Sequence, residues 1–368
     1  MSALSILPKF LWIYIAFYLE PWQVIKMHLV HRSFDKIFDE NYYRIRFIYH
    51  RKEKIAITQS ISRISWKQSL LTYIGCNKIE DVYGLISSVL RRKTDRLIRA
   101  PINFAIPKAH IQFIVYMKGG LYGNKSDGHG FGDTYFNVEH NQPTLSPTYQ
   151  MEIIGNEDAD NPTVINFKRP DNRMNILVTK NFAISNIVFN DTTIVISNKS
   201  DNANCTISNC TFIMSNLIVN RINNYTINRC KFYYCKMRLY NYDMINPLYS
   251  SAIIMTGQVS DCIFRSTSKY LVDVHIKKSN FNDASVFTFA FNTMQHYGES
   301  SSSIINTRSM YFPLFRLTDN TVINVGKLSS EPISADRFWI QDNIFENCGS
   351  ELTNQVYLYS HCSGCHIM

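Results

Sequence analysis

The hexapeptide ISNIVF at residues 184–189 returns as ISNCTF at 207–212, INRCKF at 227–232 and VSDCIF at 259–264. Looser copies are IKKSNF at 276–281, LTDNTV at 317–322 and IQDNIF at 340–345. Successive copies start 23, 20, 32, 17, 41 and 23 residues apart, and we interpret the interval of 41 as two units. A period of this size is typical of stacked structural repeats.

Each hexapeptide predicts two short strands joined by a tight bend. The fourth and sixth residues, such as Cys210 and Phe212, share one face of a strand because side chains alternate along it. The first residue, Ile207, would face the opposite way on a straight strand. A bend at the third residue, commonly Asn or Asp, corrects the phase, because these residues tolerate the left-handed conformation that the bend needs. Both strands then face one interior.

Stacking such units gives a mainly β fold, a parallel β-helix whose crossovers we expect to be right-handed. Equivalent side chains would form ladders, and Cys210, Cys230 and Cys262 are predicted to form one as small buried hydrophobic side chains. Leucine-rich repeats are the alternative of similar length, but they need Leu where these units have Ile, Cys and Phe. The stretches MEIIGNEDADNPTVINF (151–167) and VYMKGGLYGN (115–124) resemble early coils of the pectate-lyase-like β-helix superfamily.

The net charge divides the chain into two parts. Residues 1–100 hold 17 Lys+Arg and 8 Asp+Glu, whereas residues 101–368 hold 21 of each. The whole excess of +9 therefore lies in the first 100 residues. This predicts a basic N-terminal domain that contacts an acidic partner. Nucleic acid is the rival partner, but the chain has no known nucleic-acid-binding motif, and we expect none to be bound.

The first 51 residues predict a small helical domain. One apolar helix face is formed by Leu11, Ile15, Tyr18 and Leu19, which recur at three- and four-residue steps. Pro8 suits the first turn of this helix, and Pro21 ends it. Further helices follow, with Val24 and Leu29 on the second and Phe34 on the third.

The same residues resemble an F-box. The elements that match the family in order and spacing are Leu7-Pro8, Leu11, Ile15, Tyr18-Leu19, Pro21 and Val30-His31-Arg32-Ser33-Phe34. The departures from the family pattern are Lys9 in place of an acidic residue, His31 in place of Cys, and Tyr42-Tyr43 in place of Trp. Ser65-Trp66-Lys67 is similar to the Trp-Lys element that often follows an F-box.

The resemblance implies docking on another protein. F-box helices pack on the acidic Skp-type adaptor of SCF ubiquitin ligases, in complex with cullin. The residues carried over as adaptor contacts are Leu7, Pro8, Leu11, Ile15, Tyr18, Leu19, Val30 and Phe34. A basic head suits an acidic adaptor, because complementary charge speeds encounter while apolar anchors hold the complex.

These features predict four segments. They are an F-box-like helical domain at 1–51, a basic helical linker at 52–100, parallel β-helix repeats at 101–360 and a tail at 361–368. Within the linker, helices are expected around Trp66–Tyr73 and Ile79–Leu90, followed by the basic cluster Arg91–Arg99.

Cysteine content bears on the compartment. The nine Cys are odd in number and irregularly spaced, which favours reduced thiols in the cytoplasm or nucleus over a secreted disulfide framework. The apolar stretch FLWIYIAFYL (10–19) is too short to span a bilayer, and no small-residue cleavage site follows it. We therefore expect no membrane association.

Catalytic and metal chemistry have weak signals. Gly128-His129-Gly130 is similar to a polygalacturonase motif, but it precedes the clear repeats and lacks the paired Asp motifs that accompany it in that family. The C-terminal HCSGCH (361–366) has a Cys-x-x-Cys-His spacing, yet a loose tail is the simpler interpretation. We expect no catalytic residue, no metal and no cofactor.

The sequence therefore predicts a non-catalytic substrate-recognition subunit of an SCF-type E3 ubiquitin ligase. Its F-box would dock on the Skp-type adaptor, and its β-helix would bind an unidentified protein target. The alternatives are a β-helix protein that binds or cleaves carbohydrate, and an interaction scaffold whose head caps its own β-helix.

Overall fold

The computed structural model describes a large part of the 368-residue chain. The described residues are 8–19, 23–24, 26–27, 33–53, 55–60, 74–76, 111–123, 149–166, 173–178, 181–198, 203–241, 254–266, 270–275, 286–297, 302–307, 311–329, 334–352 and 354–355. The chain forms two compact units. The first contains Met1–Lys118 and Met151–Ile153, and the second contains Gly119–Gln150 and Ile154–Met368.

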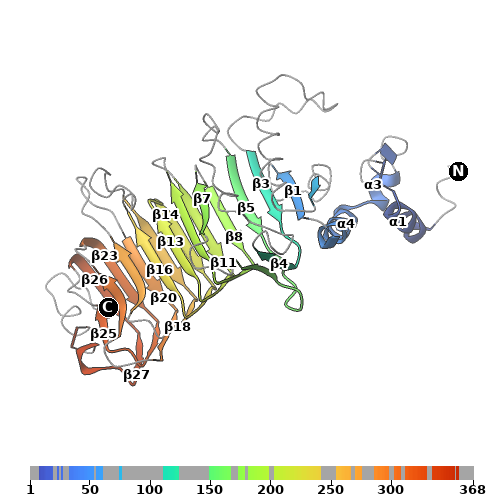
Figure 1. Ribbon diagram of the computed structural model, residues 1–368. Helices are drawn as coiled ribbons and strands as arrows, with labels where there is room; N and C mark the ends of the chain where they lie inside the picture. Colours follow the sequence, from blue (N-terminus) through green and yellow to red (C-terminus); the bar gives the residue numbers. More distant parts are fainter. Residues whose placement is uncertain are drawn as a thin grey trace. The chain divides into compact units, whose positions relative to one another are not determined.

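The first unit begins with helices and continues with strands (Figure 1). Its helices are α1 (Lys9–Phe17), α3 (Ser33–Ile37) and α4 (Glu40–Glu53), and Gln23, Val24, Lys26 and Met27 are also helical. We call these helical residues the head. Its strands are β1 (Ile55–Ser60), β2 (Ile74–Cys76) and β3 (Ile111–Tyr116), and β1 pairs antiparallel with both β2 and β3. Strand β5 (Tyr149–Ile154) is divided between the units.

Two of these strands fall in the segment that we expected to be a helical linker. Strands β1 and β2 occupy 55–60 and 74–76, so these residues are extended and not helical. The β-branched and apolar sequence IAITQS of β1 favours a strand, a signal that the charge of the surrounding segment concealed. The helices expected around Trp66–Tyr73 and Ile79–Leu90, and the basic cluster Arg91–Arg99, lie outside the described residues.

The second unit is built from three parallel sheets, as in a parallel β-helix (Figure 1). Sheet A begins with β2, β1, β3 and β5 and continues in the order β8 (Asn181–Ser185), β11 (Asn204–Ser208), β14 (Asn224–Asn228), β17 (Thr256–Ser260), β20 (Val286–Ala290), β23 (Tyr311–Thr318) and β26 (Ser334–Gln341). Sheet B has the order β4 (Gly120–Gly123), β6 (Thr163–Asn166), β9 (Ile187–Asn190), β12 (Thr211–Ile213), β15 (Lys231–Tyr233), β18 (Ile263–Ser266), β21 (Thr293–His296), β24 (Thr321–Ile323) and β27 (Ile344–Glu346). Sheet C has the order β7 (Arg173–Val178), β10 (Thr193–Asn198), β13 (Asn216–Asn220), β16 (Lys236–Tyr240), β19 (Tyr270–His275), β22 (Ser303–Thr307) and β25 (Lys327–Ser329).

The chain visits the sheets in a fixed cycle, so that β11, β12 and β13 form one coil and β14, β15 and β16 form the next. Neighbouring coils are in register: Ile207 pairs with Ile227, and Phe212 pairs with Phe232. We call this repeating part the β-helix body. The parallel stacking that the hexapeptides predicted is therefore confirmed, while the right-handed sense of the crossovers stays a prediction.

The bend between sheets A and B lies at the third residue of each hexapeptide. Seven bend residues have φ between 51° and 59°, namely Asn186, Asn209, Arg229, Asp261, Phe291, Asp319 and Asp342. Except at Asp342, on the last described coil, their backbone N–H groups donate to the next coil, as from Asn209 N to Asn228 O at 3.2 Å. The predicted left-handed bend is therefore correct, and it persists where the residue is Arg or Phe.

One predicted repeat is placed differently. The copy expected at 276–281 lies outside the described residues. The bend that joins β20 to β21 lies in FAFNTM, at 289–294, with Phe291 at the third position. Phe291 carries no turn signal, because left-handed backbone is strongly disfavoured for a bulky side chain. The hexapeptide pattern, which has Asn or Asp at the third position, therefore does not predict this copy.

The fourth residues of the hexapeptides form a column, which we call the fourth-position ladder, and all of them are buried except the last, Asn343, which is half-buried. Its members are Ile187, Cys210, Cys230, Cys262, Asn292, Asn320 and Asn343. The thiols approach carbonyl oxygens of the preceding coil, as from Cys230 Sγ to Ile207 O at 3.7 Å. The amides do the same at closer range, as from Asn320 Nδ2 to Phe289 O at 3.1 Å. The predicted Cys ladder is confirmed as buried, and an asparagine ladder continues it.

The sixth residues form an aromatic stack inside the body. Phe189, Phe212, Phe232 and Phe264 lie with successive ring centroids 5.0, 4.7 and 4.8 Å apart and with their planes within 17° of parallel. Each of these rings is buried, and burying an aromatic side chain contributes about 2 kcal/mol or more. This stack and the ladder make the interior of the body.

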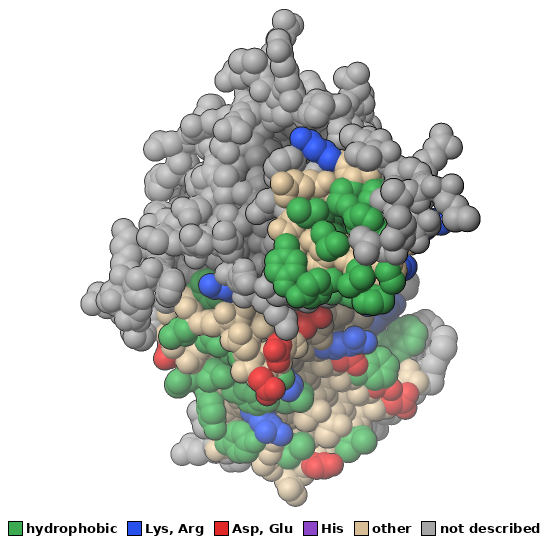
Figure 2. Space-filling view, turned by 90° about the vertical axis from the view of Figure 1, so that its right-hand side faces the viewer, with side chains coloured by type: hydrophobic (Ala, Val, Ile, Leu, Met, Phe, Trp, Pro, Cys, Tyr) green, Lys and Arg blue, Asp and Glu red, His purple; other side chains and the backbone are tan. Residues whose placement is uncertain are grey.

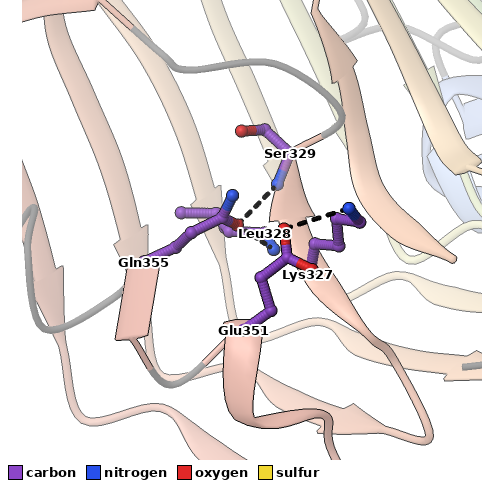
Figure 3. A network of polar contacts seen from close by, with 5 residues as sticks. All are labelled: Lys327, Leu328, Ser329, Glu351 and Gln355. Atoms are coloured by element: carbon purple, nitrogen blue, oxygen red, sulfur yellow. Dashed lines mark hydrogen bonds and ion pairs between the residues drawn. The ribbon is translucent and has the colours of Figure 1, made fainter. Parts of the chain in front are cut away.

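The last strand of sheet C is contacted by residues 350–352 and 354–355, whose backbone is helical. Figure 3 shows Glu351 and Gln355 beside Lys327, Leu328 and Ser329. Gln355 Oε1 accepts hydrogen bonds from the backbone N–H groups of Leu328 at 2.8 Å and Ser329 at 3.3 Å. Lys327 Nζ lies 3.0 Å from Glu351 Oε1, and Leu352 is fully buried. These contacts satisfy polar groups of β25, the last strand of the sheet, whose unpaired edge would otherwise be open to another strand.

Candidate functional site

Helix α1 presents apolar side chains to solvent. Phe10, Tyr14 and Tyr18 lie four residues apart on one face and are 67%, 61% and 74% exposed, and Ile15 beside them is 40% exposed. The hydroxyl of Tyr18 donates to that of Tyr14 at 2.8 Å, and their rings meet edge to face. Figure 2 shows hydrophobic side chains (green) gathered on the head. A cluster of this kind is typical of a protein-binding surface.

The other side of α1 is held by an aromatic core. Ala16 is fully buried, and the Trp12 ring packs edge-on against Phe34 with centroids 5.2 Å apart. Phe34 in turn stacks on Phe38, and the ring centroids of Phe38 and Tyr42 are 4.8 Å apart. The core therefore fixes which face of α1 points outward.

Arg46 on α4 completes the attachment of α1. Its side chain is 1% exposed, and its guanidinium donates to the carbonyl oxygens of Ala16 and Leu19 at the C-terminal end of α1. It also donates to the Tyr42 hydroxyl at 2.7 Å. A helix C-terminus has unpaired carbonyls and a partial negative charge, so a buried cation there is stabilised without a carboxylate. Burial raises the pKa of Tyr42, partly offset by Arg46, so its hydroxyl stays neutral.

Asp39 directly precedes α4 and also contacts Lys9 at the start of α1. Its Oδ1 accepts from the Tyr42 backbone N–H at 2.9 Å, and its Oδ2 lies 3.3 Å from Lys9 Nζ. The hydrogen bond from Tyr42 lowers the pKa of Asp39, and Lys9 acts in the same direction. Lys9, which departs from the F-box pattern, thus ties the start of α1 to the start of α4.

The predicted adaptor contacts fall into three groups. Exposed or half-exposed on α1 or directly beside its ends are Pro8, Leu11, Ile15, Tyr18 and Leu19. Phe34 is 3% exposed and belongs to the aromatic core, so it positions α1 and offers no surface. Leu7 and Val30 lie outside the described residues.

Two further side chains belong to this surface, and sequence reasoning did not select them. Phe10 and Tyr14 are among the most exposed large apolar residues of the described chain. Their four-residue spacing with Tyr18 was the available signal. Arg46 gave no signal, because its role depends on where α1 ends in space.

The structure says less about the other motifs that the sequence offers for catalysis or metal binding. Gly128-His129-Gly130 and the tail with HCSGCH lie outside the described residues, and within the described ranges no group of three or more His, Cys, Asp or Glu could hold a metal ion. Burial raises the pKa of Cys230 well above its ordinary value, so this thiol stays protonated and unreactive. Among the helices described, none is long and apolar enough to cross a membrane.

Comparison of the chain with protein-family models, with curated proteins and with solved structures finds no match in any of the three.

Proposed function

We propose that this protein is the substrate-recognition subunit of an SCF-type E3 ubiquitin ligase. The observation that carries the proposal is the exposed apolar face of α1, formed by Phe10, Tyr14, Ile15 and Tyr18. It occupies the stretch of sequence that resembles an F-box. In this proposal α1 packs on the Skp-type adaptor, and the β-helix body binds a protein target.

The energetics of such docking are favourable. An amphipathic helix in an apolar groove is a common recognition mode, and buried aromatic anchors supply most of its affinity. Four large apolar side chains at helical spacing offer such anchors at no cost in backbone ordering, because Arg46 and the aromatic core already hold the helix. The net charge of +9 in residues 1–100 would speed encounter with an acidic adaptor.

A β-helix suits the second half of this task. Its interior is fixed by in-register ladders, so its outer face is a rigid surface on which turns and loops can vary. In an SCF-type complex such a body would hold the target, while bond formation takes place on other subunits.

Co-purification tests the proposal. The intact chain and variants are expressed in a eukaryotic cell, and recovery of the Skp-type adaptor and cullin is measured. Ile15→Glu should abolish recovery, because it places a charge within the apolar surface, next to Tyr14 and Tyr18. Ile45→Glu is the matched control, since Ile45 is also helical, also on the head and 47% exposed, but lies on α4. Failure of the wild-type chain to recover the adaptor, or equal loss with Ile45→Glu, would contradict the proposal.

A further inference from the structure

The outer face of sheet A carries a pocket at its C-terminal coils. Its volume is about 290 Å³, and strands β23 and β26 with their bends supply most of its lining: Arg316, Thr318, Asp319, Trp339, Gln341 and Asp342. This size lies at the lower end of the range for ligand sites, so the pocket admits a small group and not a whole molecule of drug size.

Arg316 and Trp339 form one wall. They are register partners on β23 and β26, and the guanidinium carbon lies 5.2 Å from the centre of the Trp339 ring system. Trp339 Nε1 donates to Gln341 Oε1 at 2.8 Å, which fixes the indole. Arg316 Nε is buried and donates to no described residue. This wall therefore joins the indole ring of Trp339 to the positive charge of Arg316.

Asp319 and Asp342 form the other wall. Both occupy left-handed bends with φ of 56° and 52°, on consecutive coils, and Asp319 N donates to Gln341 O at 3.1 Å. Of the seven bends between sheets A and B in the described chain, only these two place like charges on neighbouring coils. Like charges on adjacent strands repel. In the described residues neither carboxylate has an ion pair that would relieve this.

The pocket thus requires a specific chemistry from its occupant. Two carboxylates and one guanidinium leave a net charge of −1, so a single positive charge completes the site. The occupant must donate hydrogen bonds to the carboxylates, accept one from Arg316 and place an apolar group against Trp339. A peptide that carries a primary ammonium meets all three demands, because the same chain also supplies a backbone carbonyl and an apolar group.

We propose that this pocket binds a primary ammonium group of a polypeptide, held between Asp319 and Asp342, with a neighbouring carbonyl on Arg316 and a side chain on Trp339. The ammonium comes from a free N-terminus or from a lysine side chain. This inference rests on the proposed function, since it names the chemical feature that the β-helix body recognises in its target. Divalent cations fit less well, because Arg316 already places a positive charge in the pocket.

The indole N–H of Trp339 reports on the pocket directly. Full-length protein labelled with ¹⁵N at its four Trp gives one indole signal per residue, and Trp339→Phe identifies the relevant one. Three probes are titrated: alanine N-methylamide with an α-ammonium, Nα-acetyl-lysine N-methylamide with a side-chain ammonium, and Nα-acetyl-alanine N-methylamide with neither. We expect a saturable shift of the Trp339 signal with one or both ammonium probes and none with the third. The first two probes distinguish the two sources of the ammonium.

The double variant Asp319→Asn/Asp342→Asn should weaken ammonium binding about tenfold or more, since hydrogen bonds to charged groups are the stronger class. Asn retains the bend, because Asn186 and Asn209 occupy the same position on other coils. Asp261→Asn, at an equivalent bend away from the pocket, is the control and should leave binding unchanged. Equal shifts with the acetylated alanine probe, no shift with any probe, unchanged binding in the double variant, or binding of Ca²⁺ or galacturonic acid in place of the ammonium would each overturn the proposal.

The two proposals fail separately. Ile15→Glu should leave the Trp339 titration unchanged, and Asp319→Asn/Asp342→Asn should leave adaptor recovery unchanged. Ammonium binding without adaptor binding would remove the ligase function and keep the pocket. Adaptor binding without ammonium binding would do the reverse.

Discussion

The two halves of the fourth-position ladder meet the same need with different side chains. Cys210, Cys230 and Cys262 line the earlier coils, and Asn292, Asn320 and Asn343 line the later ones. In both halves the side chain donates to a carbonyl of the preceding coil: Cys262 Sγ lies 3.6 Å from Ile227 O, and Asn292 Nδ2 lies 3.0 Å from Val259 O. From Cys210 onward the column is therefore a hydrogen-bonding position, and the thiols are more than small hydrophobic fillers.

In the asparagine half of the ladder, each side chain makes more hydrogen bonds to neighbouring coils. The backbone N–H groups of Cys262, Asn292 and Asn320 each donate to the amide oxygen of the next coil, at 2.9, 3.0 and 3.0 Å. A thiol is a weak donor and a weak acceptor, whereas an amide has two N–H donors and a strong acceptor. We infer that the amide coils depend on their ladder for stability, and that the thiol coils depend more on the Phe stack beside them.

Removing one amide should give the largest effect. Asn320 is 1% exposed, donates to Phe289 O and Thr318 O, and accepts from the backbone of Asn292. Asn320→Ala leaves these buried groups unpaired, which should lower the free energy of unfolding by about 3 kcal/mol or more in a urea titration. Cys230→Ala at the equivalent place should cost only about 1 kcal/mol. Equal losses in the two variants would remove the distinction between the halves.

Alkaline pH should weaken the thiol half alone. Burial raises the pKa of Cys230 well above its ordinary 9 and raises the pKa of Cys235 to about 11. A thiol whose pKa is raised on folding stabilises the protein fully below pH 9, and this contribution is lost as the pH rises towards the folded value. The loss is about 1.4 kcal/mol for each pH unit above 9. Between pH 8 and 10.5, Cys230→Ala should therefore lose about 2 kcal/mol less stability than the wild-type chain.

A matched amide variant checks this pH dependence. Asn343→Ala removes no titrating group, so its stability should fall with pH as steeply as that of the wild type. A flattened profile in Asn343→Ala, or a wild-type slope in Cys230→Ala, would contradict the role given to the thiol.

Exchanging the two side chains should give an asymmetric result. Asn292→Cys replaces two amide donors and an acceptor by one thiol, and it should lower the free energy of unfolding by about 2 kcal/mol. Cys262→Asn places an amide, with two N–H donors, within reach of Ile227 O and Ser260 O, which now share the single S–H proton, so it should change stability by less than about 1 kcal/mol. Thermal unfolding of the two variants measures the difference, and symmetric losses would show that local packing outweighs the ladder.

The smallest effect is expected at Tyr225, in the thiol-bearing coils. Its hydroxyl is buried without a hydrogen-bond partner among the described residues, and its ring occupies the space left by Gly257 on the next coil. Tyr225→Phe should leave stability unchanged or raise it by up to about 1 kcal/mol, because an unpaired buried hydroxyl is removed. Gly257→Ala is the contrasting variant, since its methyl group would clash with the Tyr225 ring and destabilise this coil. A loss in Tyr225→Phe would point to a partner outside the described residues.

The repeat pattern reveals the coil, its buried positions and its bends, because each depends on residues adjacent in sequence. Asn209 and Asp261 signal their left-handed conformation directly, whereas Phe291 adopts it because the strands on either side are already in register. The sequence shows Asn at the fourth position of LTDNTV and IQDNIF, but the atoms with which these side chains form hydrogen bonds lie on neighbouring coils. The asparagine ladder therefore follows only once the register is known.

The candidate sites show the same division. The four-residue spacing of Phe10, Tyr14 and Tyr18 predicts an apolar helix face, but which face points outward depends on Trp12 packing against Phe34. Arg316 and Trp339 are far apart in sequence. They become neighbours in space because they occupy paired positions on consecutive coils. Sequence periodicity places such residues on a face, and the pairing between coils decides which of them meet.

Calorimetric titration of a purified Skp-type adaptor into the intact protein tests the central claim most directly. We expect saturable binding of one adaptor per chain, weakened about 100-fold or more in Ile15→Glu and unchanged in Ile45→Glu, because a buried anchor of an interface is worth several kcal/mol. No heat of binding with the wild-type chain, or equal affinity for wild type and Ile15→Glu, would contradict the claim.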